Sequence, residues 1–276
     1  MNKAKRRKHR GFLKLIIVVL ITAGFWFFEN YTFKVEEAEI KSKKLTDKLT
    51  FAVISDLHGS VFGKDNSALI NKIDSLDPDL IFVLGDMYSS TDKTEDAKYR
   101  AADLMESFAA PVYFVPGEHD YGEGFEEMLT DRGINVMPDR SEKLTIAGNN
   151  ITIYGIDDVY FPPNFNLESK FGEVDSDSYT ILLAHIPHFD LYMPWGADLV
   201  LCGDTHGGVM QIPFCGPLYY EGRWLPELTS DREVYDKGLY ETGGRYMFVT
   251  SGLGNFPAPV RLFNRPEVAV IKVLPR

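Results

Sequence analysis

The chain has 276 residues, 45% hydrophobic and 25% charged, which is enough to bury a full core and excludes both a disulfide-stapled miniprotein and a disordered tail. Its formal net charge of −11 argues against a nucleic-acid partner, because an acidic surface repels a phosphate backbone. The two cysteines, Cys202 and Cys215, are too few for a disulfide framework, and the sequence leaves open whether they pair.

The amino terminus combines a basic block with an apolar run. Residues 1–14 hold seven of the 29 basic residues and no acidic one, and residues 15–28 are almost entirely apolar. At about 1.5 Å per residue, Phe12 to Phe28 spans roughly 26 Å, close to a hydrocarbon core of about 30 Å. We expect residues 1–14 to be cytoplasmic and residues 15–28 to be a transmembrane signal anchor, which places the rest of the chain outside the cytoplasm.

A cleaved signal peptide is the alternative, and cleavage near Gly24 would release a soluble secreted protein. The aromatic run that follows Gly24 is a poor cleavage site and a good interfacial anchor, and therefore favours the uncleaved form. Residues 29–48 show no strong periodicity and are predicted to be a stalk. Residues 49–276 show no repeat or break in composition, and are predicted to form one domain.

Five short apolar runs, each ending in a polar cluster, follow one another along this domain. They cover residues 49–54, 80–84, 112–115, 179–184 and 199–202. Continuous rather than alternating apolar runs predict strands covered on both faces. Further strands are expected over 150–154, 246–250 and 268–273. Helical spacing appears over 66–76, 95–108 and 124–129, so the chain is predicted to be an α/β protein with ligands beyond the carboxyl ends of its strands.

The polar clusters contain residue types that bind divalent transition metals. The candidate ligands are Asp56, His58, Asp86, Glu118, His185, Asp204 and His206. Each alone is weak evidence, since a single histidine is more often packed or solvated. Four of the six histidines nevertheless follow predicted strands, and a mixture of carboxylates and imidazoles favours two ions that share a carboxylate.

In order, these clusters resemble the motifs of the calcineurin-like metallophosphoesterases, and more narrowly of their membrane-anchored bacterial branch. The motifs D-x-H, G-D, G-N-H-[DE], a lone H and G-H-x-H correspond to Asp56–His58, Gly85-Asp86, Gly117–Asp120, His185 and Gly203–His206. The resemblance runs from about residue 49 to the end. It implies a four-layer α/β/β/α sandwich and a phosphoester hydrolase, with phosphodiesters preferred over phosphomonoesters.

The resemblance also implies the role of each residue. Asp56, His58, Asp86 and His206 would hold one metal, and Asp86 would bridge to a second metal held by Glu118, His185 and Asp204. A hydroxide bridging the metals would attack phosphorus, and His119 would be catalytic, protonating the leaving oxygen or steadying the phosphoryl group. The metals would be Mn, Fe, Zn or Mg.

The chain departs from the family pattern at two positions of the second metal. Glu118 replaces an asparagine and Asp204 replaces a histidine, so two neutral donors become carboxylates. Oxygen donors shift the preference at the second site toward harder ions, and favour Mn. The alternative is a degenerate, weakly or non-catalytic metal-binding scaffold of the same fold, although such a scaffold has no need of His119.

Three residues near the carboxyl terminus are candidates for substrate binding. Arg261, Asn264 and Arg265 carry donors that suit a substrate phosphate, although an arginine near a chain end is more often a surface ion pair. The substrate is expected to be a phosphoester within reach of the membrane, with lipid head groups, polyprenyl phosphates and cell-wall phosphodiesters as the candidate sources.

Overall fold

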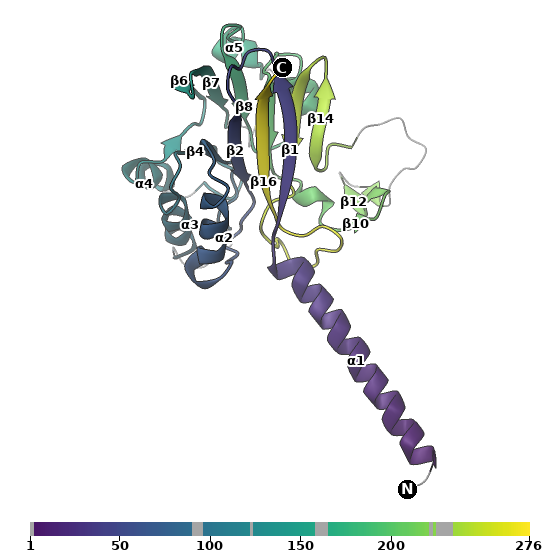
Figure 1. Cartoon of the computed structure of the whole chain (residues 1–276). Coiled ribbons are helices and arrows are strands. Elements are labelled where there is room, and N and C mark those ends of the chain that lie inside the picture. The colour runs from purple at the N-terminus through teal and green to yellow at the C-terminus, as the bar shows by residue number, and fades with distance from the viewer. Residues whose placement is uncertain (1–2, 90–95, 122–123, 158–164, 221–222, 225–233) are drawn as a thin grey trace.

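Two six-stranded sheets form the body of the molecule, which we describe from a computed structural model (Figure 1). The structure describes residues 3–89, 96–121, 124–157, 165–220, 223–224 and 234–276. In sheet order, the first sheet contains β1 (Lys34–Ser42), β16 (Glu267–Pro275), β2 (Leu49–Ile54), β3 (Leu80–Val83), β4 (Val112–Phe114) and β5 (Asn135–Val136). The second contains β14 (Gly238–Thr242), β15 (Arg245–Val249), β9 (Leu199–Cys202), β8 (Tyr179–Leu183), β7 (Asn149–Gly155) and β6 (Arg140–Ile146).

The helices and two small hairpins complete the fold. The helices are α1 (Lys3–Tyr31), η1 (Lys64–Asn66), α2 (Ser67–Asp74), α3 (Asp96–Glu106), α4 (Phe125–Asp131), α5 (Leu167–Phe171), α6 (Phe189–Tyr192) and η2 (His206–Gly208). The hairpins pair β10 (Gln211–Ile212) with β11 (Gly216–Pro217), and β12 (Tyr219–Tyr220) with β13 (Arg223–Trp224).

The central strands of both sheets are buried on both faces, as the continuous apolar runs predict. Successive side chains of a strand point to opposite faces. In β2, Phe51 and Val53 belong to the core between the two sheets, whereas Ala52 and Ile54 pack in the core that includes α2, α3 and α4. A third core lies on the other side of the second sheet and includes Leu167 of α5 and Tyr192 of α6. This arrangement confirms the four-layer sandwich.

The predicted strands and helices lie close to their observed bounds, whereas the strands β1, β5, β6 and β14 were not predicted. The segment predicted as a stalk contains β1, an edge strand that pairs in parallel with β16 over its whole length. Ala38 and Ile40 point into the core between the sheets, while Glu37 and Glu39 are exposed. Exposed charges are typical of a protected sheet edge, and they hide the alternating pattern in the sequence. Glu95, at the start of the helix predicted over 95–108, lies outside the described residues.

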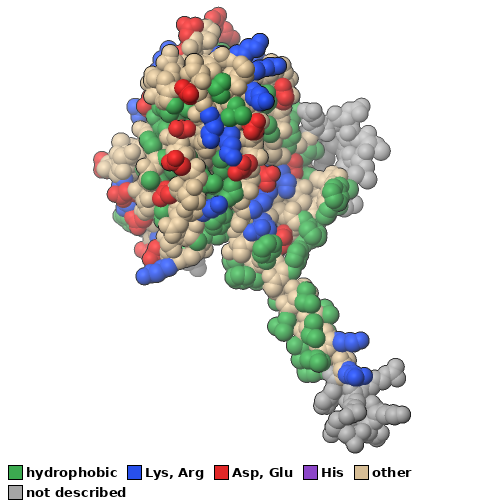
Figure 2. All heavy atoms as spheres, viewed as in Figure 1, with side chains coloured by type: hydrophobic (Ala, Val, Ile, Leu, Met, Phe, Trp, Pro, Cys, Tyr) green, Lys and Arg blue, Asp and Glu red, His purple; other side chains and the backbone are tan. Residues whose placement is uncertain are grey.

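Helix α1 extends away from the sandwich and exposes its apolar side chains (Figures 1 and 2). The segment Arg10–Tyr31 is long and apolar enough to cross a membrane, and its apolar 18-residue window, with a mean hydropathy of 2.2, is not buried. A signal sequence passes the same test. The helix continues beyond the predicted end at Phe28 to Tyr31, and its last turn packs against the body of the molecule.

Candidate metal centre

The predicted metal ligands lie on loops that follow strands of both sheets. Asp56 and His58 follow β2, Asp86 follows β3, and His185 follows β8. Asp204 and His206 follow β9. The loops of the two sheets touch directly, because the backbone N–H of Asp204 donates to the carboxylate of Asp56 at 3.2 Å.

The backbone of these loops adopts an uncommon conformation. Positive φ angles occur at five of the predicted ligands: Asp56 (52°), His58 (45°), Asp86 (55°), Asp204 (67°) and His206 (49°). Non-glycine residues adopt this left-handed region at a cost, although Asp and His do so more readily than most. Such residues cluster at functional sites, where the surrounding structure holds them in place.

Six side chains come together in three overlapping groups of potential metal ligands. Within each group one ligand atom per residue lies within 4.8 Å of the others. The groups are Asp56, His58 and His206; His58, Asp86 and His119; and Asp56, Asp86 and His185. We call these six residues the ligand cluster.

Asp86 occupies the middle of the ligand cluster. Its Oδ2 atom lies 3.5 Å from Nε2 of His58 and 3.5 Å from Nε2 of His185. Its Oδ1 accepts a hydrogen bond of 2.8 Å from the backbone N–H of His119. A Cβ atom at Gly117 would lie only 2.3 Å from this Oδ1, so residue 117 must be glycine for the loop after β4 to approach Asp86. Asp86 therefore belongs to two groups of potential ligands, one with His58 and the other with His185.

The orientation of His185 fits a metal ligand. Its Nδ1 lies 2.6 Å from the carbonyl oxygen of Leu84, and because a carbonyl only accepts, Nδ1 carries the proton. In the neutral ring Nε2 is then a lone pair directed at the carboxylates of Asp86 and Asp204, at 3.5 and 3.8 Å, and it has no hydrogen-bond partner. Burial opposes a charged ring, yet the carboxylates of Asp86, Asp56 and Asp204 raise the pKa of His185 well above its usual value. Nε2 therefore favours a positive charge beside it, which a divalent metal can supply, so these residues fit such a metal.

His58 and His206 also direct nitrogen atoms at a shared space. Their Nε2 atoms are 3.2 Å apart, and Nε2 of His206 is 3.7 Å from Oδ1 of Asp56. Burial lowers the pKa of His58 to about 4, and burial together with the charge of Arg261 holds the pKa of His206 well below its usual value. Both rings are thus neutral at pH 7, which is the form that binds metals.

The carboxylates respond to burial in different ways. Burial raises the pKa of Asp56 to about 7 and also raises the pKa of Asp204, in each case with a contribution from neighbouring carboxylates. Burial alone would raise the pKa of Asp86 as well, but the neighbouring ring of His185 and the hydrogen bond from the backbone N–H of His119 lower it. A cation in the cluster would favour the ionised form of all three groups.

Glu118 and Asp204 lie at the margin of the ligand cluster, in none of the three groups. The Glu118 side chain is 52% exposed, with Oε1 at 3.7 Å from Nε2 of His119. The Asp204 side chain is 35% exposed. These are the two positions at which the sequence departs from the family pattern, and the predicted second site is therefore less enclosed than the predicted first.

His119 lies at the solvent side of the ligand cluster. Its ring contacts the rings of His58 and Phe256, with centroid separations of 5.0 and 4.7 Å, and its side chain is 11% exposed. Phe256 also stacks on His58 at 4.6 Å. Sequence analysis missed Phe256, because a lone phenylalanine in a Pro-rich loop carries no signal that links it to two histidines distant in the chain.

Asp120 is a second residue whose role the sequence did not reveal. It is buried, and its carboxylate accepts the backbone N–H groups of Asp86, Met87 and Gly117 at 2.5, 3.0 and 3.0 Å. Burial raises the pKa of Asp120 to about 7. Asp120 joins the loops after β3 and β4, and so positions Asp86. Its place in the motif after His119 was the available signal.

The three residues expected to bind a substrate phosphate make other contacts. The Arg261 side chain is buried and donates to the carbonyl oxygens of Ser251, Gly254 and Asn264, with one nitrogen 3.4 Å from Nδ1 of His206. Asn264 donates to the carbonyl oxygen of His206 at 2.7 Å. These two side chains therefore face the protein and position His206.

Arg265, the third of these residues, lies at the end of α1. Its guanidinium group is 4.0 Å from the ring centroid of Phe28 and donates to Thr32 and Phe33. A guanidinium group over an aromatic face is a cation–π contact. The forked donors of Arg265 thus join the last turn of α1 to the body of the molecule rather than facing a phosphate.

The chain belongs to the calcineurin-like phosphoesterase family, whose model matches residues 49–208. It is 28% identical over 289 residues to the uncharacterized metallophosphoesterase YkuE of Bacillus subtilis (strain 168), covering 98% of each chain. It is 27% identical to an uncharacterized metallophosphoesterase of Helicobacter pylori (strain J99), covering 99% of this chain and 73% of that one. The chain is therefore a phosphoester hydrolase of a family that uses divalent metals.

A phosphodiesterase is also among the relatives. Phosphodiesterase YaeI of Escherichia coli (strain K12) is 27% identical to this chain over 212 residues. The aligned region covers 71% of each of the two proteins. Among solved structures, TT1561 of Thermus thermophilus aligns with a TM-score of 0.48 and 13% identity, over 74% of this chain and 89% of its own.

Proposed function

We propose that this protein is a metal-dependent phosphodiesterase, held at the extracytoplasmic face of a membrane by α1. The observation that carries the hydrolytic part is the position of Asp86 between His58 and His185, with Oδ2 at 3.5 Å from a nitrogen of each. Asp56, His58, Asp86 and His206 would hold one divalent cation. Asp86, Glu118, His185 and Asp204 would hold the second.

Charge supports a diester rather than a monoester as the substrate. Four carboxylates, on Asp56, Asp86, Glu118 and Asp204, surround the two sites and offset the charge of two divalent cations. A nearly neutral centre lacks the strong attraction that a positive centre has for a dianionic phosphomonoester. A phosphodiester carries only one negative charge, so its binding depends less on this attraction. The added oxygen donors of Glu118 and Asp204 favour Mn at the second site.

Different residues of the chain would position the ligands and donate a proton. Bound divalent cations would supply an activated water and neutralise charge on the phosphoryl group. Asp120 and Gly117 hold Asp86 in place, and the Leu84 carbonyl fixes the proton of His185 on Nδ1. His119, at the solvent side of the ligand cluster, would give a proton to the leaving oxygen, a role that contributes about 10²- to 10⁴-fold in rate.

The membrane part of the proposal is supported by α1 and the charges before it. The apolar segment Arg10–Tyr31 covers about 33 Å at about 1.5 Å per residue, enough for a hydrocarbon core of about 30 Å. The basic residues of the first 14 positions favour a cytoplasmic amino terminus. The substrate is then a phosphodiester linked to a lipid or to the cell wall.

Metal analysis of the full-length protein, combined with turnover, tests the hydrolytic part. The purified protein is reconstituted with Mn, Zn, Fe or Mg and assayed with bis(p-nitrophenyl) phosphate. We expect two metals per chain, and a loss of at least 100-fold in kcat for His119→Gln without loss of metal. His9→Gln, in the basic amino-terminal segment, is the matched control and should retain full activity.

Two outcomes contradict this proposal. Turnover that persists in His119→Gln would show that His119 does not donate a proton in the reaction. A protein that never holds more than one metal per chain, and lacks turnover that depends on His119, is instead a degenerate scaffold. The exposure of Glu118 favours this second reading, because a half-exposed carboxylate must move inward to complete the second site.

A further inference from the structure

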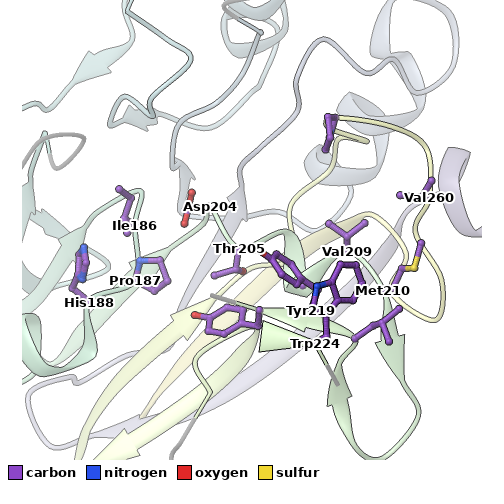
Figure 3. A pocket seen from close by; sticks show the side chains of 14 residues that line it. Ile186, Pro187, His188, Asp204, Thr205, Val209, Met210, Tyr219, Trp224 and Val260 are labelled. Carbon is purple, nitrogen blue, oxygen red and sulfur yellow. The ribbon is translucent and has the colours of Figure 1, made fainter. Parts of the chain in front are cut away.

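A cavity of about 670 Å³ opens beside the ligand cluster (Figure 3). His188 and Asp204 line it, and Oδ1 of Asp204 lies 3.8 Å from Nε2 of His185. Its volume falls within the range of about 300 to 1,000 Å³ that is usual for small-molecule sites. A molecule in this cavity would therefore have one end at the candidate metal centre.

The walls of the cavity are mainly apolar. Val209, Met210 and Leu218 line it, with Tyr219 and Trp224 of the β12–β13 hairpin (Figure 3). None of the described residues that line the cavity is a lysine or an arginine. The cavity thus offers apolar contact but no cationic side chain for a second anionic group. It suits the part of a phosphoester that carries no charge.

The rim of the cavity exposes large apolar side chains to the surroundings. Trp224 is 72% exposed, Tyr219 46% and Val260 40%. Leu262 and Phe263, which follow on the same loop as Val260, are also exposed. Contiguous exposed apolar side chains of this kind mark binding surfaces for proteins, ligands or membranes.

The last turn of α1 contacts the loop that contains Val260, so the rim of the cavity lies next to the candidate membrane helix. Nε1 of Trp26 donates to the carbonyl oxygen of Pro259 at 2.8 Å, and the rings of Phe25 and Phe263 are 5.8 Å apart. Val260 of the rim lies between these two contact points in the chain. Figure 1 shows the hairpins and the loop before β16 at the end of the body from which α1 emerges. With α1 in a bilayer, the rim lies at the bilayer surface.

We infer that this cavity binds the hydrocarbon chain of a membrane lipid, and that the substrate is a lipid phosphodiester whose chain enters past Trp224 while its phosphate reaches the ligand cluster. This inference rests on the proposed function and narrows its substrate class to lipids. Hydrolysis would add water across the bond from phosphorus to the leaving oxygen, giving a phosphomonoester and an alcohol. Cell-wall polymers, which lack a hydrocarbon chain at the scissile ester, would not use the cavity.

Chain-length dependence tests the inference. Full-length protein in phosphatidylcholine nanodiscs, loaded with Mn, is assayed with p-nitrophenyl alkyl phosphodiesters whose alkyl group has two or eight carbons. For the wild type we expect kcat/KM to be at least 10-fold higher for the octyl ester. In Trp224→Ser, and independently in Tyr219→Ser, this octyl-to-ethyl ratio should fall at least threefold.

Phe214→Ser is the matched control, since Phe214 is a fully exposed aromatic residue in the turn of the neighbouring β10–β11 hairpin and does not line the cavity. Its octyl-to-ethyl ratio should equal that of the wild type. Nanodiscs concentrate the octyl ester equally for all variants, so the comparison between variants isolates the cavity. Equal ratios in wild type, Trp224→Ser and Tyr219→Ser overturn the inference. Failure of the proposed function is distinct, because neither ester would then be hydrolysed in a manner that depends on His119.

Discussion

At the scale of single residues, the site depends on groups that hold the ligands as much as on the ligands themselves. Asp120 receives three backbone N–H groups around Asp86, and the carbonyl of Leu84 sets the protonation of His185. Ligands oriented in this way lose less conformational freedom when they bind a cation. The left-handed backbone at Asp56, His58 and Asp86 is a cost that these contacts offset.

Replacement of Asp86 by asparagine should reduce the binding of both cations together. Asp86 faces His58 on one side and His185 on the other, so loss of its charge weakens two sites rather than one. We expect Asp86→Asn to weaken Mn binding at least 10-fold at each site, as measured by calorimetric titration of the full-length protein. Asp103→Asn is the control, because Asp103 is an exposed residue of α3 paired with Arg132. Retention of one site at its normal affinity would show that Asp86 does not bridge.

At the scale of elements, the last turn of α1 is part of the framework of the metal centre. The buried side chain of Asn30 donates to the carbonyl of Arg261 at 3.1 Å and accepts from its N–H at 2.7 Å. Arg261 and Asn264 in turn contact His206. A protein that begins at residue 31 would therefore lack Asn30, which holds the loop containing Arg261 behind the candidate ligand His206.

Asn30→Ala should accordingly affect metal binding as well as stability. The substitution leaves the N–H of Arg261 buried without a partner, which costs about 1–3 kcal/mol in the free energy of unfolding. If Asn30 positions His206, Mn affinity in the folded protein should also fall about threefold or more, as measured by titration below the unfolding temperature. Asn71→Ala, at an exposed position of α2, is the control. A purely structural role would lower the unfolding temperature and leave the affinity unchanged.

The elements that could be predicted from the sequence are those with continuous apolar runs. The strands over 49–54 and 199–202 were predicted to the residue, because a strand buried on both faces has little room for polar residues. β1 was missed because only alternate positions are buried at a sheet edge. The grouping of Asp56, Asp86 and His185 followed from strand ends, but the contacts of Arg261 depend on a loop whose path no local pattern sets.

At the scale of the whole molecule, the two sheets bring their loops together at one site and α1 leaves from an adjacent end of the body (Figure 1). The acidic character of the chain is confined to the part after residue 14, whereas the basic residues before α1's apolar segment would face the opposite side of a membrane. Size, charge and topology thus agree with a catalytic domain carried by a single membrane helix, as proposed.

The orientation of this arrangement can be tested with the chain's own cysteines. Cys202 is buried in β9 and Cys215 is exposed, so a thiol reagent should modify residue 215 selectively. With the domain outside the cytoplasm, a membrane-impermeant maleimide should label Cys215 in intact cells as completely as in permeabilised cells. Cys215→Ser should abolish the labelling in both samples. Labelling that appears only after permeabilisation would place the domain in the cytoplasm.

The short connection between α1 and β1 determines how a membrane-anchored domain of this kind would encounter its substrate. α1 ends at Tyr31 and β1 begins at Lys34, where Lys34 N–H already bonds to Pro266 O, so the sandwich follows the helix without a flexible tether. A domain attached in this way diffuses in two dimensions and encounters its substrate per unit of membrane area rather than per unit of volume. Its turnover in a cell should then scale with the surface density of the substrate, and dilution of the surrounding medium should leave it unchanged.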